Sequence, residues 1–161
     1  MQLTDDHTQH SIPLNMTLSR FFFPLLLAVV ALLCTASLMH AQTVRTPPEG
    51  SMERKAIMDT LRVPCEKDLK QKVIFVVTTF NVSGNWAFVS VTPKTPEGGK
   101  IDYKRTRYRE QVEAGMFDDN AVALLKKDDD GNWKVLEYTL GNTDAPQAAW
   151  GDTYKLPKGL L

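Results

Sequence analysis

The chain has little of the chemistry that most catalytic sites need. All its histidines, His7, His10 and His40, precede residue 41. A Ser-His-Asp or Cys-His site is therefore excluded from the rest of the chain, because its general base is missing. Beyond residue 41 there is one cysteine, Cys65, which excludes an internal disulfide and a Cys/His structural zinc site there. We accordingly predict no cofactor and no metal.

Cys65 itself has two readings. The first is a small, partly buried residue on a helix, as free cysteines usually are. The alternative is an exposed thiol that pairs with another chain.

The chain also has no excess of charge of one sign, since 19 basic and 19 acidic residues give a formal net charge of zero. The sequence therefore predicts no nucleic-acid partner, because no bulk electrostatic attraction to phosphates is present.

The N-terminal segment has the pattern of an export signal. Arg20 precedes the apolar run FFFPLLLAVVALLC, and small residues lead to a cleavage point after Ala41. Residues 1–15 carry acids and no basic residue, so we interpret them as a mis-called start and residues 16–41 as a signal peptide. The protein is then exported, to the periplasm or the outside of the cell. The alternatives are an uncleaved anchor, which would be its only membrane contact, and lipid attachment at Cys34.

The exported part is predicted to be one domain over residues 52–161, after a flexible lead-in at 42–51. Three-to-four spacing of apolar residues predicts a helix over 52–69, with Ser51 as a partial cap. Pro64 is expected to bend or interrupt this helix. The apolar stripe consists of Ile57, Leu61 and Leu69, with Ala56 and Cys65 nearby.

Four β-rich runs follow the helix. They are predicted as strands over about 73–82, 86–93, 121–127 and 133–141, with a short helix near 145–154. Turn residues join the strands in hairpins, most clearly Asp130-Gly131. The predicted class is therefore α+β, with an N-terminal helix packed on a curved antiparallel sheet. Among the aromatic residues, Trp150 is expected to close over the sheet and anchor the C-terminus.

Several stretches carry a resemblance to known families. They are ERKAIMDTLR, GNWAFV, IDYKRTRY, EAGMFDDNAVALL and GNWKVLEYTLGNTD, with the late Trp150. In these and in the order of elements, the chain resembles cystatin-like and NTF2-like proteins, and more narrowly a group of small exported bacterial proteins of unassigned activity. The resemblance implies the fold and the exported location, and it supplies no catalytic residues.

The stretch Lys100–Arg109 holds five basic residues and two tyrosines, and its secondary structure is ambiguous between strand and helix up to Tyr108. In a strand its basic side chains would point to both faces, as in a solvated edge strand that resists pairing. The alternative is a surface for an anionic ligand or an envelope polymer. The candidate binding residues are Tyr103, Arg105, Arg107 and Tyr108.

Two carboxylates are candidates for acid/base chemistry, Asp102 beside Tyr103 and Glu137 beside Tyr138. Either would need burial to raise its pKa into a useful range. From these residues we expect a non-catalytic binding or accessory domain for a protein, an envelope component or a small ligand. The alternative is a small acid/base enzyme with a buried carboxylate in an NTF2-like pocket.

Overall fold

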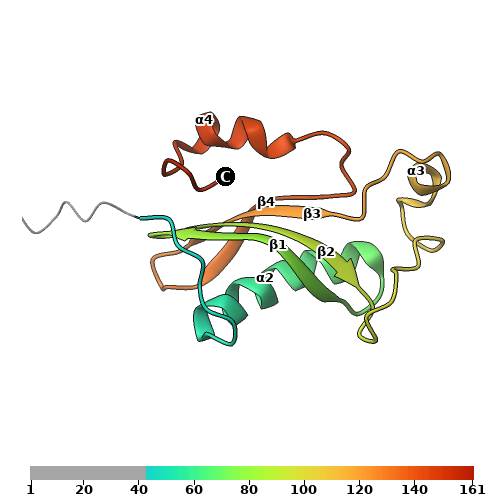
Figure 1. Cartoon of the computed structure of the whole chain (residues 1–161), viewed down its shortest axis with the longest axis horizontal. Coiled ribbons are helices and arrows are strands. Elements are labelled where there is room, and N and C mark those ends of the chain that lie inside the picture. Colours follow the sequence, from blue (N-terminus) through green and yellow to red (C-terminus); the bar gives the residue numbers. More distant parts are fainter. Residues whose placement is uncertain (1–42) are drawn as a thin grey trace, which may run out of the picture. The chain divides into compact units, whose positions relative to one another are not determined.

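The computed structural model describes residues 43–161 (Figure 1). The predicted start and signal peptide, residues 1–41, lie outside the described residues. Of the helices in the described part, none is both long and apolar enough to cross a membrane.

Helix α2 spans Met52–Leu69, the range predicted from its apolar spacing. The Ser51 hydroxyl accepts a hydrogen bond from the backbone amide of Arg54, which confirms the predicted cap. The helix runs through Pro64 without a break, so an interruption there is wrong. Its C-cap is Lys70, whose backbone is left-handed (φ 55°).

Four strands form one antiparallel sheet in the order β1-β2-β3-β4. They are β1 (Ile74–Ser83), β2 (Trp86–Lys94), β3 (Ala121–Lys127) and β4 (Trp133–Leu140). Each strand pairs with its sequence neighbour, so β1 and β4 are the two edges. Both edge strands have a register shift, between Val77 and Thr79 in β1 and opposite the Leu124–Leu125 step of β3 in β4. The α+β class is confirmed, and the sheet is not closed.

The two faces of the sheet are covered by different parts of the chain (Figure 1). Helix α2 packs on one face through Ile57, Leu61, Cys65 and Leu69, within the larger apolar cluster. Trp150 buries itself on the other face, edge-on to Phe88 with 6.4 Å between ring centroids. The covering elements there are η2 (Pro146–Ala149) and α4 (Trp150–Tyr154).

The chain end is fixed on this second face. The Asn81 side-chain amide donates to the Leu160 carbonyl at 2.9 Å, and Leu160 is fully buried. Together with the packing of Trp150, this confirms that the tail closes over the sheet and anchors the C-terminus.

The basic stretch before α3 (Arg109–Glu113) is neither strand nor helix but a series of turns. Side chains bind the backbone locally: the Asp102 carboxylate accepts from the Lys104 amide at 3.0 Å, and the Thr106 hydroxyl donates to the Tyr103 carbonyl at 2.8 Å. Such bonds compete with strand pairing and favour turns. The interpretation of this stretch as an edge strand is therefore wrong.

Candidate functional site

Three of the four predicted binding residues come together, but they bind each other and the chain around them. Arg107 Nη2 lies 2.7 Å from Asp68 Oδ2 and donates to the Tyr108 hydroxyl oxygen at 2.8 Å. The Tyr108 hydroxyl in turn donates to Asp68 Oδ2 at 2.9 Å. Tyr103 donates to Asp119 Oδ1 at 2.7 Å. We call these five residues the tyrosine cluster.

An aromatic contact joins the two halves of the tyrosine cluster. The Phe117 ring lies 4.7 Å from that of Tyr103 and 5.2 Å from that of Tyr108, measured between centroids. Asp68 belongs to the last turn of α2. The cluster therefore ties the turns of residues 100–109 to the C-terminal end of α2, with its hydrogen-bonding groups directed at one another.

Burial shifts the acid–base behaviour of this region. Desolvation raises the pKa of Tyr103 and Tyr108, and also that of Tyr138 on β4. The same cause raises the pKa of the Cys65 thiol to about 11. Cys65 is fully buried on α2, which confirms the first reading of this residue and keeps its thiol protonated at neutral pH.

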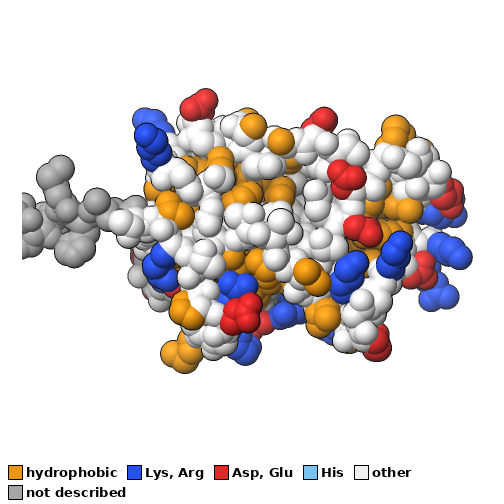
Figure 2. Space-filling model, viewed as in Figure 1, with side chains coloured by type: hydrophobic (Ala, Val, Ile, Leu, Met, Phe, Trp, Pro, Cys, Tyr) orange, Lys and Arg blue, Asp and Glu red, His pale blue; other side chains and the backbone are white. Residues whose placement is uncertain are grey.

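Arg105, the fourth predicted binding residue, stands apart from the tyrosine cluster. It is exposed, and within residues 43–161 it forms no ion pair and no side-chain hydrogen bond. Figure 2 shows basic side chains at the end of the molecule that carries α3, with acidic side chains among them. On the face that Figure 2 shows, side chains of both signs are interspersed there.

The two candidate acid/base residues do not share a pocket. Asp102 is exposed in the turns after β2. Glu137 is half-buried and accepts a hydrogen bond from the Tyr154 hydroxyl of α4, on the sheet face away from α2. In the described part of the chain no charged side chain is fully buried, and no cluster of His, Cys, Asp or Glu is placed to hold a metal ion.

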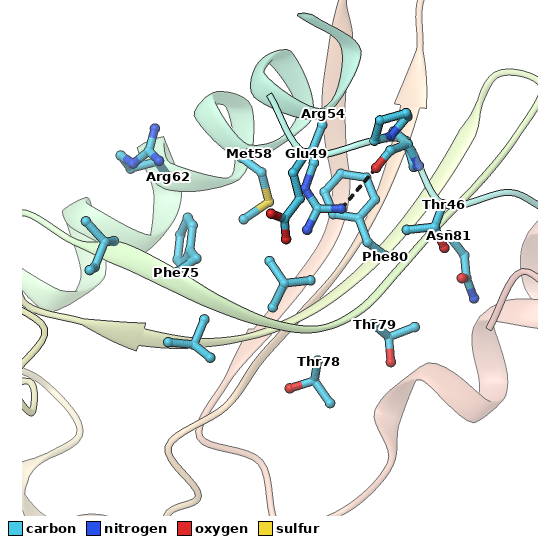
Figure 3. Close-up of a pocket in the computed structure, with 15 residues that line it drawn as sticks. Thr46, Glu49, Arg54, Met58, Arg62, Phe75, Thr78, Thr79, Phe80 and Asn81 are labelled. Atoms are coloured by element: carbon cyan, nitrogen blue, oxygen red, sulfur yellow. Dashed lines mark hydrogen bonds between the residues drawn. The ribbon is translucent and has the colours of Figure 1, made fainter. Parts of the chain in front are cut away.

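A different feature is open to a partner: a groove along the free edge of β1, which we call the β1 groove (Figure 3). Its volume is about 1020 Å³. One wall comes from α2, one end from the segment before it, and the floor from β1. The lining residues are Thr46–Glu49, Arg54, Met58, Arg62 and Ile74–Asn81.

The outer edge of β1 is occupied at one end. Arg45 and Val82 exchange two backbone hydrogen bonds, at 2.9 and 2.8 Å. Pro47 follows and has no amide hydrogen to continue such a ladder. Because backbone groups of alternate strand residues point to the same side, the N–H and C=O of Phe80 also point outward, into the β1 groove.

The side chains of β1 are uncharged throughout, and two of its large apolar side chains are exposed to solvent. Ile74 is 41% exposed and Val76 53% exposed. Edge strands usually carry charges or prolines that discourage pairing with another chain, and β1 has neither. Within β1 itself, the register shift at Thr78 is a device of this kind.

Two arginines of α2 lie over phenylalanine rings of β1 within the groove. The Arg54 guanidinium carbon is 4.5 Å from the Phe80 ring centroid, and that of Arg62 is 5.6 Å from the Phe75 centroid. Arg62 also forms an ion pair with Asp59 and donates to the Val73 carbonyl.

The β1 groove was not predicted from the sequence, because the candidate binding residues were chosen from the most highly charged stretch of the chain. The available signal was the opposite one: the first strand of a meander is at an edge, and IFVVTTFNVS has no charged residue. What the sequence did not show was that residues 46–49 and α2 would leave that edge uncovered.

Comparisons with protein-family models, with curated proteins and with solved structures find no match for this chain. The resemblance to cystatin-like and NTF2-like proteins therefore stays a prediction.

Proposed function

We propose that this protein is an exported, non-catalytic binding protein, and that its domain binds an extended segment of a partner protein by strand addition to β1. The observation that supports this most directly is the uncharged outer edge of β1 at Ile74–Asn81, which lies inside an open groove before the bridge of Val82 to Arg45. Peptide recognition of this kind takes affinity from backbone hydrogen bonds and specificity from alternate side chains.

The arrangement of β1 meets both requirements. Outward-pointing backbone groups near Phe80 offer a donor and an acceptor to a second strand. Phe75, Val77 and Phe80 pack toward α2, while Ile74 and Val76 alternate with the first two, point to the opposite face and are exposed. A bound strand would place alternate side chains against these two sets.

A protein segment fits this groove better than the other partner classes we expected. The groove follows a strand edge over eight residues of β1, Ile74–Asn81, which matches an extended chain better than a compact small molecule. The basic surface that an anionic envelope polymer would need is weakened, since Arg107 is already bound to Asp68.

The first test selects ligands and then probes their backbone. A displayed random-peptide library is panned against protein purified after expression of the full chain. The best peptide is then resynthesised with N-methyl groups on its even or on its odd residues. Strand addition uses the amide hydrogens of alternate residues only, so one methylated series should lose binding and the other keep it. Equal effects of both series would overturn strand addition.

The second test uses matched variants of the two edge strands. Val76 on β1 and Leu136 on β4 are both exposed apolar residues. Val76→Lys should weaken peptide binding by about tenfold or more, because a lysine on an edge strand discourages pairing. Leu136→Lys should leave the affinity unchanged. The reverse order, or equal losses, would place binding away from β1.

Export is tested separately. Expression of the full chain in a bacterial host should yield protein in the periplasm or medium, with Gln42 as its first residue. A chain that stays in the membrane fraction with its N-terminal segment intact would support the anchor instead.

A further inference from the structure

We propose that Arg54 makes the β1 groove selective for an acidic side chain, Asp or Glu, at one position of the bound segment. This rests on the proposed strand addition and specifies its ligand. It assigns to Arg54 a role in specificity.

Arg54 is positioned but has no acidic partner. Its guanidinium lies over the Phe80 ring and donates one hydrogen bond, from Nη1 to the Pro47 carbonyl at 3.2 Å. In residues 43–161 no carboxylate lies within ion-pair distance of it. A guanidinium has five N–H donors, so most of those on Arg54 are available to a ligand.

Arg62 is the contrasting case in the same groove. It too faces a phenylalanine ring of β1, but Asp59 neutralises it and the Val73 carbonyl accepts its Nε–H. Of the two stacked arginines, only Arg54 combines an oriented guanidinium with an unmet charge.

The register of a bound strand directs one ligand side chain at Arg54. Phe80 has its backbone groups outward and its side chain on the α2 face, beneath the guanidinium. Residues directly opposite in paired strands project to the same face of a sheet. The ligand residue opposite Phe80 therefore points toward Arg54, and a carboxylate there can accept charge-assisted hydrogen bonds.

Glu49 is the acidic side chain that lines the same part of the groove (Figure 3). It forms no ion pair with Arg54 or with any other residue of the described chain. A ligand carboxylate at Arg54 would approach it, and like charges repel. Removing this charge by Glu49→Gln should therefore strengthen the binding of an acidic peptide.

The test uses the peptides selected above against the wild-type protein and three variants. We expect selection to enrich Asp or Glu at one position, and a Glu→Gln change there to weaken binding about tenfold, the size of a charge-assisted contact. In Arg54→Gln this preference should disappear. In Arg62→Gln, the matched control, it should remain. In Glu49→Gln the acidic peptide should bind about twofold to threefold tighter.

The outcomes separate this inference from the proposed function. Peptides that bind β1 in the alternating N-methyl pattern, but show no acidic preference, would overturn the role of Arg54 and leave strand addition intact. An acidic preference that survives Arg54→Gln would do the same. A library that yields no peptide dependent on β1 would overturn both.

Discussion

The stretch Lys100–Arg109 and strand β1 are opposites in sequence and in structure. The first holds five basic residues and two tyrosines, and both tyrosines, Arg107 and Arg109 are bound to acidic side chains of the same molecule. The second holds no charge, and its outer edge is open. The comparison shows that a dense run of charge in a sequence can be a fold-internal device. A partner needs groups that the fold has left unmatched.

The largest expected effect is alkaline destabilisation through the region around the tyrosine cluster. Burial raises the folded-state pKa of Cys65 to about 11 from 9.0, and those of Tyr103, Tyr108 and Tyr138 are also raised. The folded state thus disfavours their charged forms. The contribution of these groups to the free energy of unfolding is complete below about pH 9 and is lost as the pH rises through their folded-state pKa values. From the shift of Cys65 alone, we expect urea unfolding to show a loss of about 2 kcal/mol between about pH 8 and pH 11, and the tyrosines should add to it.

Cys65→Ala is the control for this prediction. It removes a fully buried titrating group, so the loss of about 2 kcal/mol that Cys65 supplies should disappear and the part due to the tyrosines should remain. The edge strand β1 contains no titrating side chain and should contribute nothing. A free energy of unfolding that stays flat over this pH range would contradict the prediction.

The next effect concerns two carboxylates. Asp68→Asn should cost about 2 kcal/mol of stability, because Arg107 and Tyr108 lose a charged acceptor that they share. Asp102→Asn should cost less than about 0.5 kcal/mol, since an exposed Asn can still accept from the Lys104 amide. Chemical denaturation measures both. Equal losses would show that the tyrosine cluster does not stabilise the fold as a unit.

A smaller effect separates the two regions directly. Arg107→Gln should cost about 1 kcal/mol of stability, since the arginine is largely exposed, and should leave peptide affinity at β1 unchanged. Arg54→Gln should weaken acidic peptides, as argued above. If Arg107→Gln reduced peptide binding as strongly as Arg54→Gln, the tyrosine cluster would have to be counted as part of the binding surface.

The smallest effect is expected for Arg105→Gln. Arg105 is exposed and has no ion pair in the described chain, so thermal stability and peptide affinity should both stay within error. A marked loss of affinity would revive the basic stretch as a ligand surface through this residue alone.

The fold was largely predictable from sequence, because its signals are local. The apolar spacing of α2 and the turn residues of each hairpin specify their elements without reference to the rest of the chain. Trp150 could be placed on the sheet because a large aromatic in a tail needs an apolar surface.

The candidate site was not predictable to the same degree, because it depends on distant partners. Arg107 is not available to a ligand because it pairs with Asp68, 39 residues away in the sequence. The spacing of charges in the sequence does not indicate that pair. Arg54 is oriented by Phe80, and no carboxylate of the described residues, Glu49 included, lies within ion-pair distance of it, which again only the assembled fold shows.

The register shift in the middle of β1 has a further consequence. A strand that kinks at Thr78 and is already bonded to Arg45 at Val82 presents two brief ladders instead of one long, flat template. Amyloid-like stacking needs a long, flat edge to which identical chains can add repeatedly. The same geometry that leaves room for one short ligand strand would therefore prevent the protein from polymerising through the uncharged edge of β1.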